Sequence, residues 1–118
     1  MMLERIREIL DAELIVGSGA ERLDIQTVSS SDMMSDVLCF SNSPHLLLTG
    51  LINPQSVRTA EVAEIKAVCF VHGKKPPQET VELAKKSGIC LLATHCSMFT
   101  ASGKLYAAGL SGSNDVHG

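Results

Sequence analysis

Residues 46–72, LLLTGLINPQSVRTAEVAEIKAVCFVH, decide the fold class of this chain. They begin and end with short apolar runs, 46–50 and 67–71, and such unbroken runs are typical of strands buried on both faces of a parallel sheet. Between the runs, Asn53 is a favoured helix N-cap and Pro54 fits the first helical position, so we expect a helix that ends near Glu64. The stretch therefore predicts a β-α-β unit with a right-handed crossover.

The residues before this unit predict a helix, two short strands and a second helix. Apolar residues at helical spacing favour an amphipathic helix over 2–11, followed by a strand over 13–16 and a turn at 17–19. Alternating apolar and polar residues over 23–29 indicate a half-exposed strand. Ser30-Ser31-Asp32 can cap a helix over 33–40, and Asn42-Ser43-Pro44 breaks the chain before the central strand. The expected apolar side of that helix consists of Met33, Met34, Val37, Leu38 and Phe40.

The residues after the unit continue the alternation of helix and strand. We expect a helix over 78–86 that Gly88 ends, a strand over 89–93, and a last helix that Ser97 caps. The order of elements predicts one α/β domain over residues 1–110, a three-layer-like sandwich around a mostly parallel sheet. Residues 111–118 lack a pattern and are expected to form a flexible tail.

Composition excludes several classes of function. A net charge of −3 and an aromatic content of 3% argue against a nucleic-acid-binding face, which needs clustered cations or stacking aromatics. The apolar run 46–52 is far shorter than the roughly 20 residues of a membrane span, and charges interrupt the N-terminus where a signal peptide would be apolar. We therefore expect a cytoplasmic protein with no membrane contact. The four cysteines form no C-x-x-C pair, and Cys69 and Cys90 are expected to be buried, reduced thiols.

No catalytic, phosphate-loop or dinucleotide-binding motif occurs in the sequence, and we predict no catalytic residue, no metal and no cofactor. Ligands of open parallel sheets bind outside the carboxyl ends of the strands. The residues that the predicted fold brings to that edge are the candidate ligand-binding residues. They are Thr49, Gly50, Asn53, His72, Gly73, Lys74, Lys75, Thr94 and His95.

Two interpretations of this edge remain open at the level of sequence. The lysines, together with the helix starts at Asn53 and Ser97, can bind a small phosphate-bearing ligand, or Lys74 and Lys75 belong to a solvated loop. His72, His95 and Cys96 supply three candidate metal ligands, whereas structural zinc needs four, so ordinary strand-end residues are the favoured interpretation. His45 lies at the opposite end of its strand.

A carboxylate pair is a further candidate. Asp32 and Asp36 lie four residues apart on one expected helix face, and the simpler interpretation makes Asp32 a cap and Asp36 a solvated residue.

The order of elements and several segments resemble a stand-alone DRTGG domain over about residues 3–110. The segments are VSSSDMMSDVL at 28–38, LLTGLINPQSVRTA at 47–60, VCFVHG at 68–73, ICLLAT at 89–94 and SMF at 97–99. DRTGG domains are similar to the N-terminal domain of HPr kinase/phosphorylases, and their fold resembles the N-terminal domain of Mur ligases. The resemblance implies a regulatory, dimer-forming domain beside adenine-nucleotide sites, with no catalysis of its own.

Three functions are therefore carried forward. The first is a non-catalytic regulatory or ligand-sensing domain that forms a homodimer, binds an adenine nucleotide and docks onto a partner enzyme. The second is a dimerising adaptor without a small-molecule ligand. The third is a small enzyme that uses the edge formed by His72, His95 and Cys96. Met33, Met34, Phe40, Met98 and Phe99 are the apolar residues considered for the interface, although a core position is the favoured interpretation of each.

Overall fold

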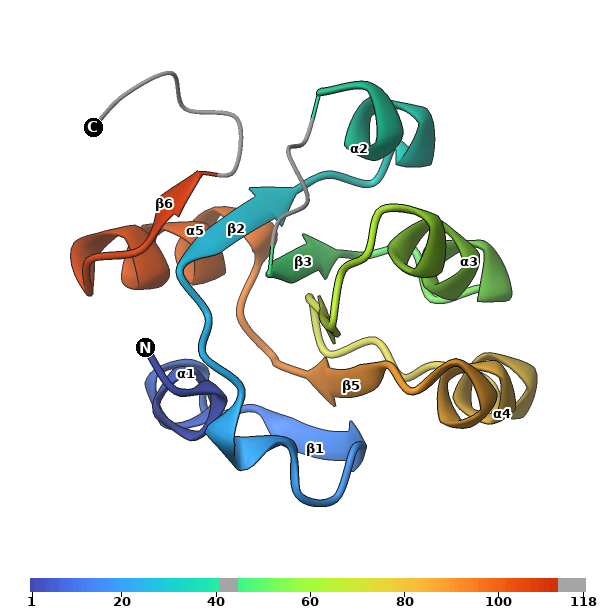
Figure 1. Ribbon diagram of the computed structural model, residues 1–118. Helices are drawn as coiled ribbons and strands as arrows, with labels where there is room; N and C mark the ends of the chain where they lie inside the picture. The colour runs from blue at the N-terminus through green and yellow to red at the C-terminus, as the bar shows by residue number, and fades with distance from the viewer. Residues whose placement is uncertain (41–44, 113–118) are drawn as a thin grey trace.

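Six strands of the described chain form one sheet between two layers of helices (Figure 1). The structure is a computed structural model, and it describes residues 1–40 and 45–112. The strands are β1 (Glu13–Val16), β2 (Thr27–Ser30), β3 (Leu46–Thr49), β4 (Ala67–Phe70), β5 (Cys90–Ala93) and β6 (Ser111–Gly112). The helices are α1 (Leu3–Leu10), α2 (Met34–Phe40), α3 (Pro54–Val62), α4 (Gln78–Ser87) and α5 (Met98–Ala107), with a 3₁₀ helix η1 at Ala20–Arg22. No described helix has the length and apolar character that crossing a bilayer requires.

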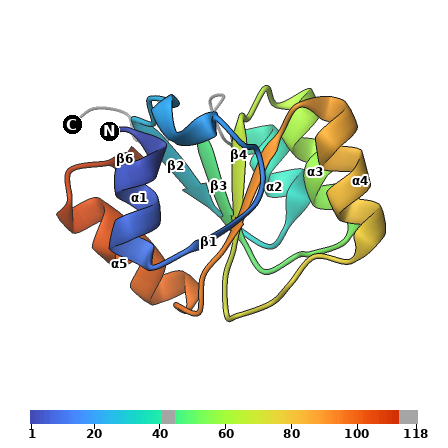
Figure 2. The same ribbon diagram turned by 90° about the horizontal axis from the view of Figure 1, so that it is seen from below.

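The sheet has the order β1-β5-β4-β3-β2-β6, and it is mostly parallel, as predicted. Only β1 runs antiparallel to its neighbour, β5, among the strands described. Helices α1 and α5 cover one face, whereas α2, α3 and α4 cover the other (Figure 2). This arrangement is a three-layer sandwich.

The central strands are buried on both faces, which is why their sequences show no alternation. All four residues of β3, of β4 and of β5 are buried. Leu46 and Leu48 pack in the core beneath α1 and α5, while Leu47 packs in the core beneath α3 and α4. The unbroken apolar runs therefore supply two cores from one set of strands.

Local capping residues fix the helix starts as predicted. The side chain of Asn53 accepts a hydrogen bond from the backbone N–H of Gln55 at 3.1 Å, and Pro54 opens α3. The side chain of Ser97 accepts from the N–H of Thr100 at 3.1 Å at the start of α5. Gly88 ends α4 in the left-handed conformation, with φ of 70°.

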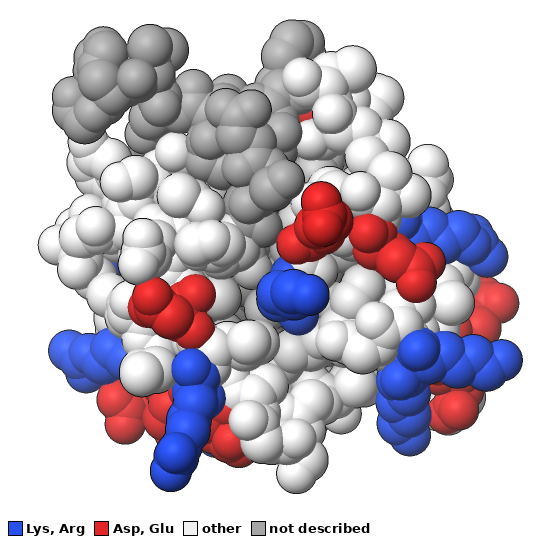
Figure 3. Space-filling model, in the orientation of Figure 1, with Lys and Arg blue, Asp and Glu red and all other residues white. Residues whose placement is uncertain are grey.

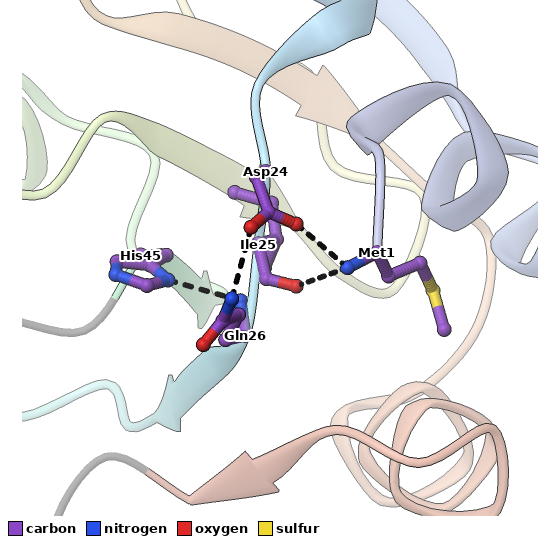
Figure 4. A network of polar contacts seen from close by, with 5 residues as sticks. All are labelled: Met1, Asp24, Ile25, Gln26 and His45. Atoms are coloured by element: carbon purple, nitrogen blue, oxygen red, sulfur yellow. Dashed lines mark hydrogen bonds and ion pairs between the residues drawn. The ribbon is translucent and has the colours of Figure 1, made fainter.

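The predicted strand over 23–29 is wrong in its first half, because β2 begins only at Thr27. Residues 24–26 bind the start of the chain and the residue before β3 instead (Figure 4). The Met1 amino group donates to Asp24 Oδ1 at 2.8 Å and to the carbonyl of Ile25 at 2.9 Å. The N–H of Gln26 donates to Nδ1 of His45 at 2.9 Å, at the amino end of β3. These contacts occupy the backbone groups that a longer β2 would use.

Two further expectations need correction. The prediction that Met33 and Leu38 belong to the apolar side of α2 is wrong, because they are 59% and 48% exposed. Met34 and Val37 are buried in the core, as predicted. The ordered chain also extends beyond residue 110, because Ser111 and Gly112 pair with β2 as the edge strand β6. The predicted break at residues 42–44, the side chain of Phe40 and the tail from residue 113 lie outside the described part of the chain.

The N-cap of α3 gives a test of this local analysis. Replacing Asn53 with alanine leaves the N–H of Gln55 without its side-chain acceptor, so we expect the free energy of unfolding to fall by about 1 kcal/mol. Asn53→Asp keeps an acceptor and should lose far less stability. Urea denaturation of the wild type and both variants measures the difference, and equal losses in the two variants would contradict the capping role.

Candidate functional site

The carboxyl ends of β2, β3, β4 and β5 lie at one edge of the sheet, because these strands are parallel. Helix α4 follows β4 on one face, and α5 follows β5 on the other (Figure 2). The point between β4 and β5 is therefore the topological switch point, outside which ligands of open α/β sheets bind. The predicted ligand-binding residues lie along this edge, in two groups.

The first group gathers around Asp32, which follows β2. Asp32 Oδ1 accepts hydrogen bonds from the N–H of Gly50 at 2.6 Å and from the hydroxyl of Thr49 at 3.1 Å. The ammonium group of Lys74 donates to the carbonyl of Gly50 at 3.3 Å. A carboxylate and a cation thus meet at the end of β3, over a residue without a side chain.

The absence of a side chain at Gly50 keeps the space between these charges open. A β-carbon at this position would lie 3.3 Å from Asp32 Oδ1 and 3.4 Å from Lys74 Nζ. Any larger residue would place its β-carbon against both the carboxylate and the ammonium group. The site can therefore present one hydrogen-bond acceptor and one cation to the same small molecule.

A tight turn after β4 directs the two lysines. His72 and Gly73 both have positive φ, 63° and 70°, and the N–H of Lys74 donates to the carbonyl of Val71 at 3.3 Å. This is the pattern of a type I′ turn, which reverses the chain within two residues. Lys74 consequently lies over Gly50, whereas Lys75 forms an ion pair with Glu13 of β1.

The second group closes the switch point itself. The N–H of His72 donates to the carbonyl of Cys96 at 2.8 Å, and the N–H of Gly73 donates to the carbonyl of Thr94 at 2.9 Å. The His95 ring packs so closely on Gly73 that a β-carbon there would lie 2.8 Å from Nδ1. The loops after β4 and β5 are therefore joined to each other, and a ligand reaches their outer side.

The hydroxyl of Thr94 points away from this outer side. It donates to the carbonyl of Leu10 at 2.7 Å, at the end of α1, and the residue is fully buried. Thr94 thus fixes α1 to the end of β5. Asn53 is likewise engaged as the cap of α3, so both residues shape the edge through contacts within the protein.

In the described chain, no hydrogen bond joins the side chain of Cys96 to that of His72 or His95. The thiol of Cys96 lies 4.0 Å from the carbonyl of Leu10, on the α1 side, while the His95 ring lies against Gly73. Within residues 1–40 and 45–112, no three His, Cys, Asp or Glu side chains are grouped as metal ligands.

Asp32 is the site residue that the sequence analysis missed. It was expected to cap α2, but its carboxylate accepts from Gly50 and Thr49, whereas Ser31 accepts from the N–H of Met33 at 3.0 Å. The signal was available, because Asp32 follows a strand whose carboxyl end lies at the ligand edge. The sequence analysis weighed Asp32 only as a helix cap or as the partner of Asp36, and did not place it at this edge. Asp36 lies exposed on α2, as the simpler interpretation had it.

The buried thiols agree with their predicted character. Cys69 and Cys90 are buried and unpaired, and burial raises the pKa of each thiol to about 12. Both therefore remain protonated near neutral pH and behave as small apolar side chains.

Comparison with known proteins shows the fold. The sequence matches no family model and no curated protein. The structure is similar to a crystal structure of the CBS and DRTGG domains of the regulatory region of Clostridium perfringens pyrophosphatase, complexed with the activator diadenosine tetraphosphate. The TM-score is 0.73 at 21% sequence identity, and the match covers 88% of this chain and 45% of that chain. This chain has the fold of part of that region.

The likeness supports the resemblance to DRTGG domains at the level of fold. The chain spans less than half the length of the pyrophosphatase region that it matches. Similarity to HPr kinase and Mur ligase domains stays a prediction.

The contact between Glu13 and Lys75 predicts a lowered pKa for the Glu13 carboxyl. The hydrogen bond and the charge of Lys75, with a smaller contribution from His95, lower the pKa of the Glu13 carboxyl below its ordinary value of 4.5. Because the folded-state pKa is the lower one, the stabilising contribution is complete above the unfolded pKa and is lost as pH falls through the folded pKa. NMR titration of Lys75→Gln should show the Glu13 pKa rising toward 4.5, and an unchanged pKa would contradict the ion pair. Lys104→Gln, on α5, is the matched control.

Proposed function

We propose that this chain is a cytoplasmic, non-catalytic regulatory domain that senses an adenine nucleotide, acts as a homodimer and controls a partner enzyme. The similarity to a pyrophosphatase regulatory region with a bound diadenosine tetraphosphate activator carries this proposal. The Asp32 carboxylate and the Lys74 ammonium group, which both lie beside Gly50, support the placement of the ligand.

The chemistry of Asp32 and Lys74 suits the two polar parts of a nucleotide. A carboxylate after a parallel strand is a good acceptor for ribose hydroxyls, as in other α/β nucleotide sites. One oxygen of Asp32 is held by Gly50 and Thr49, which leaves Oδ2 to accept from the ribose. Lys74 then binds a phosphate group, because a long hydrogen bond to a neutral carbonyl is exchanged for a shorter one between two opposite charges.

The same turn supplies a route from ligand to fold. Lys74 and Lys75 are neighbours, and Lys75 is paired with Glu13 in β1. A ligand that draws Lys74 toward a phosphate changes the loop that also holds Lys75. Ligand binding would thereby change the contact between Lys75 and the edge strand β1, and a partner enzyme bound at β1 would detect that change.

The proposed dimer surface is an apolar groove between α5 and the strands β2 and β6, on the face of the sheet that α1 and α5 cover. The groove has a volume of about 340 Å³, and its lining is predominantly apolar, with Val28, Leu105 and Leu110 among its residues. Phe99 and Tyr106 flank it and are 88% and 74% exposed. These residues lie seven apart on α5, so they share one helix face. Two large exposed aromatic residues beside an apolar groove are typical of an interface.

The adaptor remains the second candidate, since the groove needs no nucleotide to form a dimer. An enzyme at His72, His95 and Cys96 remains the third, and turnover lost in His95→Ala would be its signature.

Nucleotide binding tests the proposed site. We expect diadenosine tetraphosphate or ATP to bind the wild type in isothermal titration calorimetry, and at 100 times Kd to add about 2.7 kcal/mol of stability. Lys74→Gln removes the phosphate-binding charge and should weaken affinity by about tenfold. Lys104→Gln is the control. AMP, ADP, ATP and the dinucleotide should be tested at millimolar concentration. If none of them binds or raises the thermal stability, the nucleotide-sensing function is wrong and the adaptor function is favoured.

Sedimentation velocity tests the dimer. Tyr106→Lys places a charge beside the groove and should convert the dimer to a monomer, because an unpaired charge is costly to desolvate. Val62→Lys is the matched control, since Val62 is 72% exposed on α3, away from the groove. A monomeric wild type, or equal dissociation in both variants, would contradict the proposed surface.

A further inference from the structure

A second cavity opens at the amino edge of the sheet, opposite the candidate nucleotide site. It has a volume of about 590 Å³, within the range of about 300–1,000 Å³ that is usual for small-molecule pockets. We call it the amino-edge cavity. It lies among the turn after β1, the 3₁₀ helix η1, the start of β5 and the end of α4, and Val16, Leu23 and Ile89 contribute to its apolar lining.

A β-bulge forms one wall of the amino-edge cavity. Leu14 pairs with Leu92, but Val16 pairs with Leu91, so β1 contains one extra residue between the two pairs. As a result, Leu14 packs in the α1 and α5 core, while Ile15 and Val16 pack on the α4 side. The bulge thus turns Val16 toward α4 and into the lining.

Gly17 then brings the backbone against the floor of the cavity. Its φ is 116°, and a β-carbon there would lie 2.9 Å from the sulfur of Cys90. No other residue type fits this position without displacing Cys90. Among the residues that the structure describes, none accepts a hydrogen bond from the backbone N–H of Ser18 or Gly19, so the turn has free donors at the rim.

Three cations from three different segments meet at the amino-edge cavity. Arg22 belongs to η1, Lys66 precedes β4 and Lys85 lies in the last turn of α4. Within the described chain, neither Arg22 nor Lys66 forms an ion pair, whereas Lys85 lies 3.6 Å from Glu82. In Figure 3, Lys and Arg side chains, with Asp and Glu side chains beside them, border uncharged surface in the lower half of the view, where Figure 1 has β1 and α4.

One carboxylate lies near these cations without lining the cavity. Glu21, beside Arg22, lines a separate depression with Glu4 and Arg7, and its charge adds to burial in raising the pKa of the Cys90 thiol. Cys90 stays uncharged near neutral pH, because burial raises the pKa of its thiol to about 12. The backbone N–H of Cys90 donates to the carbonyl of Lys66 at 3.0 Å, which fixes the start of β4 beside the cavity floor.

We propose that the amino-edge cavity binds a small organic anion, a carboxylate or phosphate ester with an apolar body. The apolar body lies on Val16, Leu23 and Ile89, and the anionic group is held by Arg22 and Lys66, with the N–H groups of Ser18 and Gly19 beside it. Such a site is separate from the nucleotide edge, because the cavity lies at the amino ends of the strands. The domain then responds to two ligands of different chemistry.

NMR spectra of the nitrogen-15-labelled full chain test this proposal with three probes. Phenylbutyrate and phenyl phosphate carry the two anionic groups, and phenylbutanol is the neutral counterpart. We expect at least one anion to shift the amide signals of Gly17, Ser18, Gly19 and Ile89, with an affinity about tenfold above that of the alcohol. Equal binding of the alcohol, or no shift at these amides with either anion at millimolar concentration, would overturn the proposal.

Variants separate this site from the nucleotide edge. Arg22→Gln and Lys66→Gln change exposed side chains without ion pairs, so the fold should be retained, and each should weaken anion binding by about tenfold. Lys86→Gln is the matched control, because Lys86 follows Lys85 on α4 but does not line the cavity. Lys74→Gln should leave phenylbutyrate and phenyl phosphate affinity unchanged. Loss of anion binding in Lys74→Gln or Lys86→Gln, with retention in Lys66→Gln, would overturn the assignment.

Discussion

Burial of β3, β4 and β5 on both faces is the constraint on which the rest of this structure depends. Every residue of these strands is buried, so each face must be covered by helices. Helices α3 and α4 connect neighbouring strands and cover one face, and α1 and α5 must then cover the other. After β5 the chain therefore crosses to the opposite face and returns to pair beside β2, at the far edge of the sheet. The switch point between β4 and β5 is a direct consequence.

Since helices cover both faces, the two candidate sites lie where the strands of the sheet begin and end. At the carboxyl edge, Asp32 and Lys74 meet over Gly50. At the amino edge, Arg22 and Lys66 stand beside the amino-edge cavity, whose wall exists because β1 contains a bulge. One glycine shapes each site. A β-carbon on Gly50 would press on Asp32 and Lys74, and a β-carbon on Gly17 would press on Cys90.

The exposed aromatic residues of α5 show that residue type alone does not decide which side chains are buried. Ala101 and Leu105 are buried, and Met98 packs partly against the core. Phe99 is larger than either buried residue, yet it is 88% exposed, so the expected core position of Phe99 is wrong. Composition alone places Phe99 in the core. Only the rotation of α5 on the sheet turns it toward solvent and beside the groove.

The amino-acid sequence by itself determined the fold class, the helix starts at Asn53 and Ser97, and the general edge at which ligands are expected. These features are local, because a doubly buried strand needs an unbroken apolar run and a cap needs one polar side chain at the right place. Tertiary structure alone decided which polar groups meet. Asp32 and Lys74 lie 18 and 24 residues from Gly50, and only the register of parallel strands brings them together. Contacts at such separation are set by the alignment of whole elements, which no short stretch of sequence specifies.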